Sequence, residues 1–195
     1  MRDIRDLRRS IEYLPTAGVE PIFILDTSAI IDLEEHDPVG LRAFLDREPA
    51  NRIATPGVFM EIQRHYHTLV GRRRVIPEDL LVSIESALQE TAPLHQCIVN
   101  HHMYDHHRYT ATGIAQEICS VKKREHDPIS HPDSHTLAIT LTLAAHCDEL
   151  NLPNRYPVVL TADEHLYRPL EYLGNPLIPE HYPGYHTVRI LKTRP

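Results

Sequence analysis

Two acidic residues, Asp26 and Asp163, each follow a short apolar run of the chain. Asp26 comes directly after residues 22–25, and Asp163 comes three residues after residues 158–160. Each run has the length and β-rich composition expected of a strand that is covered on both faces of a parallel sheet. Ligands of open parallel sheets collect beyond the carboxyl ends of the strands. We therefore expect both carboxylates to project from the same edge of the sheet.

Two further acids, Glu61 and Asp133, lie near the starts of expected helices. Glu61 falls in an expected helix of residues 58–70, and Asp133 falls in the first turn of a helix that Ser130 opens. Crossovers between parallel strands bring such helix starts to the carboxyl edge of the sheet. Taken singly, Asp133 and Asp163 are better explained as helix caps, and Glu61 also fits a solvated helix position.

Taken together, these four carboxylates need cations. Asp26 is the hardest to explain in another way, because an acid between Leu25 and Ile30 is expected to be buried, where an unpaired charge is costly. Neighbouring carboxylates raise one another's pKa unless divalent ions neutralise them. Mg²⁺ and Mn²⁺ prefer oxygen ligands, and they activate an attacking water and stabilise the leaving oxygen in phosphodiester hydrolysis. The sequence therefore predicts a Mg²⁺ or Mn²⁺ site formed by the four acids.

The elements that would position these acids indicate an α/β fold. Apolar runs separated by helices predict a central, mostly parallel sheet of four to five strands flanked by helices. Strands are expected at residues 22–25, 52–55, 158–160, 176–178 and 186–191. The polar stretch of about residues 72–130 contains no clear strand and is expected to form a helical insertion.

The ends of the chain add two further expectations. Residues 1–20 are expected to form an amphipathic helix, because apolar residues recur there at helical spacing between arginines and acids. Residues 185–195 are expected to supply an edge strand and a tail. The whole of residues 1–195 is then a single domain.

Composition narrows the range of partners. The chain of 195 residues carries a formal net charge of −7. A phosphate-bearing partner must therefore be held by a local patch or through metal ions rather than by bulk charge. The three cysteines, Cys97, Cys119 and Cys147, form no Cys-x-x-Cys pair and suit a reducing compartment. Because no segment approaches the roughly 18 apolar residues of a membrane span, we expect a cytoplasmic protein without a membrane partner.

The densest positive patch follows the helix that carries Glu61. It consists of four arginines, namely Arg64, Arg72, Arg73 and Arg74. Arginine offers bidentate contacts to phosphate, so this patch could hold an RNA backbone beside the metal site. A solvated turn between helices explains the same residues equally well.

A histidine-rich segment, residues 101–107, also suggests a metal site. His102 and His106 lie one helical turn apart. Zinc sites assemble three or four ligands, however, and neither a cysteine-based pattern nor His-Glu-x-x-His appears. A solvated or interface helix face is the favoured interpretation.

The motifs around the four acids resemble, in order, those of PIN-domain nucleases. They read Ile-Leu-Asp26-Thr-Ser28-Ala-Ile-Ile, Thr-Pro-Gly-Val-Phe-Met before Glu61, Asp133-Ser-His-Thr-Leu-Ala, and Leu-Thr161-Ala-Asp163-Glu-His-Leu. The resemblance covers about residues 21–180. It implies a Rossmann-like PIN fold, Mg²⁺- or Mn²⁺-dependent cleavage of RNA, and a tetrad of metal-binding catalytic acids, Asp26, Glu61, Asp133 and Asp163.

The same resemblance implies roles for two hydroxyl groups and for several partners. The hydroxyls of Ser28 and Thr161 would hold the carboxylates or a water on the metal. The expected function is that of an endoribonuclease, either of toxin type or in RNA processing. RNA is the expected partner, and an antitoxin protein and self-association are further candidates.

Other functions fit parts of the pattern. A non-catalytic PIN-like RNA- or protein-binding module would keep the fold without the metal chemistry. A protein-only RNase P-like enzyme, which processes the 5′ end of tRNA, would share the length and the helical insertion. A phosphatase with Asp26 as nucleophile is disfavoured, because Ser28 stands where a second aspartate would be needed.

Overall fold

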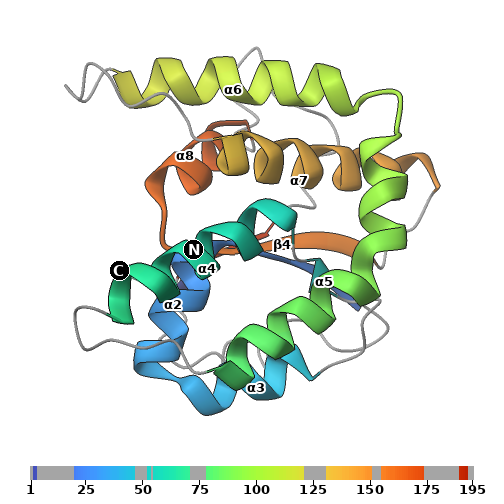
Figure 1. Cartoon of the computed structure of the whole chain (residues 1–195). Coiled ribbons are helices and arrows are strands. Elements are labelled where there is room, and N and C mark those ends of the chain that lie inside the picture. The colour runs from blue at the N-terminus through green and yellow to red at the C-terminus, as the bar shows by residue number, and fades with distance from the viewer. Residues whose placement is uncertain are drawn as a thin grey trace.

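The computed structural model describes residues 2–3, 20–46, 52–53, 55–70, 78–120, 131–150, 155–173 and 189–192. Most of these residues are helical (Figure 1). The helices are α2 (Thr27–His36), α3 (Pro38–Leu45), α4 (Pro56–Val70), α5 (Glu78–Val99), α6 (Tyr104–Ser120), α7 (His131–Glu149) and α8 (Glu164–Leu173). The strands are β1 (Arg2–Asp3), β2 (Glu20–Leu25), β3 (Arg52–Ile53), β4 (Arg155–Thr161) and β5 (Arg189–Lys192).

The strands pair in the order β1-β5-β4-β2-β3, and every pair is parallel. Only β2 and β4 are long, with 6 and 7 residues, and they pair from Glu20 opposite Arg155 to Leu25 opposite Leu160. The strands β1 and β3 contribute 2 residues each, and β5 contributes 4. The sheet is therefore one full-length strand pair with short additions on either side.

The expectation of a central sheet of four to five strands in a Rossmann-like PIN fold is therefore wrong. The protein is mostly helical around the β2–β4 pair. The expected strand of residues 52–55 is one example of a strand that is shorter than expected. It ends at Ile53, because the hydroxyl of Thr55 accepts a hydrogen bond from the backbone N–H of Val58 (3.3 Å) and so caps α4. Pro56 has no N–H to extend the ladder and begins the helix instead.

The ends of the chain also differ from the expectation. Arg2–Asp3 is a strand rather than part of a helix, and the other residues of the expected N-terminal helix lie outside the described residues, except Glu20 in β2. The strand β5 lies between β1 and β4, so it is not an edge strand. The expected strand of residues 176–178 lies outside the described residues, whereas α5 and α6 are helical as expected for the insertion.

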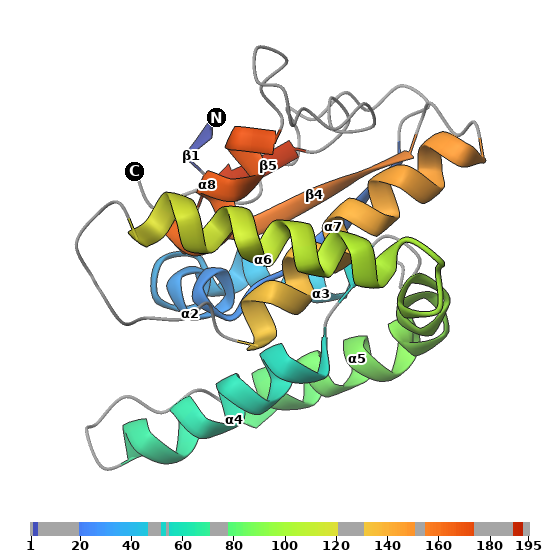
Figure 2. The same cartoon turned by 90° about the horizontal axis from the view of Figure 1, so that it is seen from above.

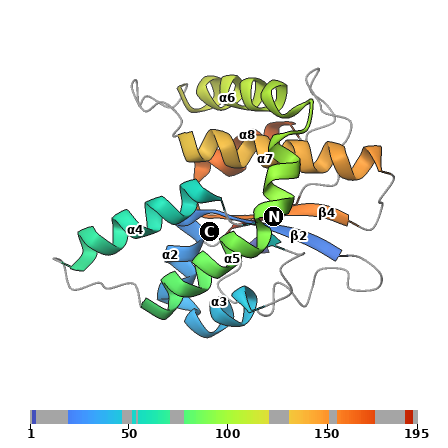
Figure 3. The same ribbon diagram turned by 45° about the vertical axis from the view of Figure 1, so that its right-hand side comes forward.

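The β2–β4 pair separates two apolar clusters, because successive side chains of a strand point to opposite faces. Phe23 and Leu25 pack with residues of α2, α3, α4 and α5. Ile22 and Ile24 pack with residues of α6, α7 and α8. Figures 1 and 3 show these two helical layers on opposite sides of the strands, and Figure 2 shows α4 beside α5.

Most of helix α7 is buried in the interior, and α8 lies beside it. Helix α7 lies between the strands and α6, which forms the outermost layer on this side (Figures 1 and 3). Its middle is buried all round, including the hydroxyls of Thr140 and Thr142. Thr140 donates to the carbonyl of Thr136 (2.8 Å), and Thr142 is hydrogen-bonded to Nδ1 of His107 on α6 (2.9 Å). Such bonds let polar residues occupy an interior helix.

None of the helices in the described ranges combines the length and the apolar character that a membrane-spanning helix needs.

Candidate functional site

Asp26 lies between the end of β2 and the start of α2. Its backbone is extended (φ −103°, ψ 149°), its N–H donates to the carbonyl of Leu160 (3.2 Å), and its carbonyl accepts from the N–H of Ile30 (3.1 Å). The side chain makes no capping hydrogen bond, although the residue occupies the cap position of α2. Only 5% of the residue is exposed. Helix capping therefore does not account for this buried carboxylate.

Two hydroxyl groups hold the carboxylate of Asp26. Ser28 donates to Oδ2, and Thr161, the last residue of β4, donates to the same oxygen (2.8 Å). Each hydroxyl also accepts a backbone N–H from the segment after β4, Ser28 from Ala162 (2.9 Å) and Thr161 from Asp163 (2.9 Å). In the described part of the chain no donor reaches Oδ1 of Asp26, so this oxygen is left for another partner.

The environment of Asp26 is unfavourable to its charge. Burial raises the pKa of Asp26 to about 7, the hydrogen bonds from Ser28 and Thr161 oppose this rise, and the charges of Asp133 and Asp163 add to it. Both of these acids are therefore close enough to repel Asp26. A carboxylate in this position is partly protonated near neutral pH, and a bound cation would restore its charged form.

Glu61 reaches the same region from α4. One of its carboxylate oxygens, Oε2, accepts a hydrogen bond from the hydroxyl of Thr27 (2.6 Å), the residue directly after Asp26. Thr27 is buried, and the sequence motifs did not predict that it would bind Glu61. The signal available was the Asp-Thr-Ser triplet, which places two hydroxyls next to one acid.

Asp163 and Asp133 lie at the starts of α8 and α7. Oδ1 of Asp163 accepts the backbone N–H of His165 (2.8 Å) and lies 3.0 Å from Nδ1 of the same residue. Asp163 thus caps α8, which is the role that the sequence predicted for this residue taken alone. Its charge also repels that of Asp26. Asp133 is half-buried in the first turn of α7.

A second hydrogen-bonded group fixes α7 close to Asp133. Nε2 of His135 lies 2.9 Å from Nε2 of His95 on α5, and Nδ1 of His135 is hydrogen-bonded to the hydroxyl of Tyr104 on α6. Burial lowers the pKa of His95 and raises the pKa of Tyr104, so both stay neutral at physiological pH. These contacts tie the two helices of the insertion to the segment that carries Asp133.

The structure places one of the four candidate RNA-binding arginines. Arg64 is exposed on α4, three residues after Glu61. Arg72, Arg73 and Arg74 lie outside the described residues.

The oxygen donors of the acidic site suit Mg²⁺ or Mn²⁺. Among the described residues, no three of the four acids have ligand atoms that all lie within 4.8 Å of one another. A Mg²⁺ ion does not need such a cage, because it usually keeps several waters and is held by one or two carboxylates together with substrate phosphates. The buried Asp26, with Oδ1 available and a raised pKa, fits this mode of binding.

Comparisons of the chain with protein-family models, with curated proteins and with solved structures find no match. The centre of the candidate site is a hydrogen-bonded unit of Asp26, Ser28 and Thr161. Glu61 is joined to this unit by a hydrogen bond from Thr27, the residue next to Asp26.

Proposed function

We propose that the protein is a Mg²⁺- or Mn²⁺-dependent endoribonuclease that hydrolyses phosphodiester bonds of RNA. The observation that carries this proposal is the state of Asp26. Its carboxylate is buried, its pKa is raised to about 7, and the charges of Asp133 and Asp163 repel it. A bound divalent cation would neutralise these like charges, so this group of carboxylates is suited to bind one.

The residues of the chain have separate tasks in this proposal. Asp26, Glu61, Asp133 and Asp163 would hold the ion, which supplies an activated water and charge stabilisation at the phosphate when it is bound. Ser28 and Thr161 hold the carboxylate of Asp26 through Oδ2, which would leave Oδ1 available to bind the ion. Thr27 orients Glu61 in the same way.

RNA as the substrate is supported by the sequence motifs, whose order and residue types resemble those of PIN-domain nucleases. An exposed cation, Arg64, also lies about one helical turn from Glu61, where it can contact a phosphate next to the proposed site. Toxin-type and RNA-processing activities share this chemistry and differ in the RNA that is cut. An antitoxin protein and self-association remain sequence-based predictions.

The test is cleavage of a mixed RNA pool that includes precursor tRNA, in Mg²⁺, Mn²⁺ or EDTA. We expect cutting only with metal ions, and a loss of at least about 100-fold in Asp26→Asn and in Asp133→Asn, since each variant removes a charged ligand. The control is Asp46→Asn, which changes an exposed aspartate at the end of α3. The positions of the fragment ends separate processing at the tRNA 5′ end from toxin-like cutting.

A non-catalytic RNA- or protein-binding module is the second candidate. It is favoured by the spacing of the acids, because no three of them among the described residues offer ligand atoms within 4.8 Å of one another. In that case Asp26 is a protonated structural residue held by Ser28 and Thr161. RNA binding that persists in EDTA, together with equal or no cutting by the wild type and the two variants, would select this function.

A further inference from the structure

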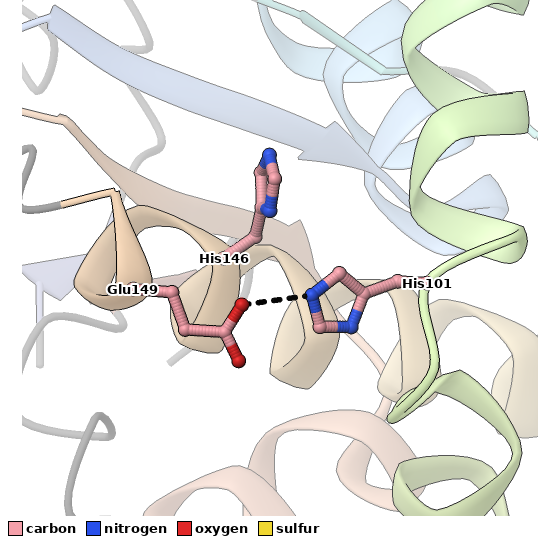
Figure 4. Close-up of side chains that lie close together, drawn as sticks. All are labelled: His101, His146 and Glu149. Atoms are coloured by element: carbon pink, nitrogen blue, oxygen red, sulfur yellow. Dashed lines mark hydrogen bonds and ion pairs between the residues drawn. The ribbon is translucent and has the colours of Figure 1, made fainter.

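A separate group of potential metal ligands lies at the other end of α7. His101 is in the turn between α5 and α6, and His146 and Glu149 are in the last turns of α7 (Figure 4). His146 and Glu149 are three residues apart and so share one face of the helix. One ligand atom from each of the three residues lies within 4.8 Å of the other two. His101 Nε2 lies 3.1 Å from Glu149 Oε2.

One atom of this group lacks a partner. Nδ1 of His146 is buried, and among the described residues it has no hydrogen-bond partner. The ring of His146 meets that of His101 edge to face, with centroids 5.4 Å apart. An unsatisfied buried polar atom is costly and rare in folded proteins. A metal ion bound to Nδ1 of His146 would remove this cost.

We propose that His101, His146 and Glu149 bind a transition-metal ion, with Zn²⁺ as the expected ion. Two imidazoles and one carboxylate are a ligand set typical of zinc, and imidazole disfavours Mg²⁺. Ligand atoms of a tetrahedral zinc site lie roughly 3.3 Å apart, given bonds of about 2.0–2.1 Å. The 3.1 Å separation of His101 and Glu149 already fits, and the ligand atom of His146 lies within 4.8 Å of both partners.

The fourth position is open to solvent or to a neighbouring histidine. Glu149 is 47% exposed on its side chain and His101 is 10% exposed, so an ion can enter from the surface. Nε2 of His102 lies 4.0 Å from the other oxygen of Glu149, which makes His102 a candidate fourth ligand. Water fills the position otherwise.

This site is distinct from the acidic one. His146 follows Asp133 by 13 positions on the same helix, so the two sites are roughly 20 Å apart at 1.5 Å per residue. The ion would join the α5–α6 turn to the end of α7, and it would hold the outer helix α6 against α7. With His102 as the fourth ligand, its expected role is therefore structural.

The test measures zinc binding to the full chain by competition with a chromophoric chelator at neutral pH, and repeats it with Co²⁺, whose visible absorption reports nitrogen and oxygen ligation. We expect one zinc ion at this site, with an affinity reduced at least about 100-fold in His146→Gln and in Glu149→Gln. His106→Gln is the matched control, because His106 is an exposed histidine on α6 outside the group. Asp26→Asn should leave the zinc affinity unchanged.

Thermal unfolding provides a second measurement. Zinc at about 100 times its dissociation constant should raise Tm by roughly 5–10 °C in the wild type and in His106→Gln, and much less in Glu149→Gln. Because Glu149 is exposed, its substitution leaves the fold intact in the absence of zinc. The proposal is overturned if the wild type binds no zinc, or if His146→Gln and Glu149→Gln bind zinc as tightly as the wild type.

Discussion

At the scale of single residues, the burial of Asp26 couples the stability of the protein to pH. Its pKa is about 7 in the fold and 3.8 when unperturbed. Between these pH values the folded state keeps a proton that the unfolded chain has released. The free energy of unfolding should therefore fall as the pH rises from about 4 to about 7, by up to about 4 kcal/mol from this residue.

Asp26→Asn tests this coupling, since the amide keeps the size of the side chain and does not titrate. Urea unfolding in EDTA at a series of pH values should show the fall in the wild type and in Asp46→Asn, and a clearly smaller fall in Asp26→Asn. Adding Mn²⁺ at pH 8 should stabilise the wild type more than Asp26→Asn. Identical pH profiles for all three proteins would show that Asp26 is not the source of the dependence.

At the scale of elements, the docking of α6 on α7 includes a buried hydrogen bond between His107 and Thr142. His107 is fully buried, and burial, followed by the charges of neighbouring histidines, lowers its pKa from 6.5 to about 4. The unfolded chain binds a proton between these pH values and the folded protein does not. The helix pair should therefore lose stability as the pH falls from about 6.5 to 4.

This effect opposes that of Asp26, so it is best measured in the Asp26→Asn background. There, the free energy of unfolding should fall by about 3 kcal/mol between pH 6.5 and 4. Adding His107→Gln should remove most of this fall, because glutamine can still bond Thr142 but does not titrate. Adding His106→Gln instead, which changes the exposed neighbour, should leave the fall in the free energy of unfolding in place. If the fall is unchanged in the protein with His107→Gln, His107 is not its source.

At the scale of the whole molecule, the two proposed metal sites lie at opposite ends of α7 and share no residue. Contributions from sites so far apart usually add within about 0.5 kcal/mol. We therefore expect Asp26→Asn to remove the stabilisation by Mn²⁺ and Glu149→Gln to remove that by Zn²⁺. The double variant should lose the sum of the two stabilisation free energies, as measured by urea unfolding with both ions present. A loss far from the sum would show that the two ends of α7 are coupled.

The overall architecture was predicted only in part. The apolar runs before Asp26 and Asp163 are strands, and the expected insertion contributes two helices, because these patterns are local in the sequence. The share of the chain that forms strands was overestimated. A short apolar segment such as residues 52–55 has the composition of a strand, but a capping threonine and a proline turn it into a helix start after Ile53.

The sequence by itself determined that short apolar runs end before Asp26 and Asp163, because strand composition is a local property of the chain. That β2 pairs with β4, and so brings Thr161 to Asp26, was decided by the tertiary structure. Only the tertiary structure decided that Thr27 bonds Glu61, and that His101 lies against His146 and Glu149. These partners are separated by tens of residues. Their contact depends on how α4, α5 and α6 pack against the strands and α7, and no local periodicity in the chain encodes that packing.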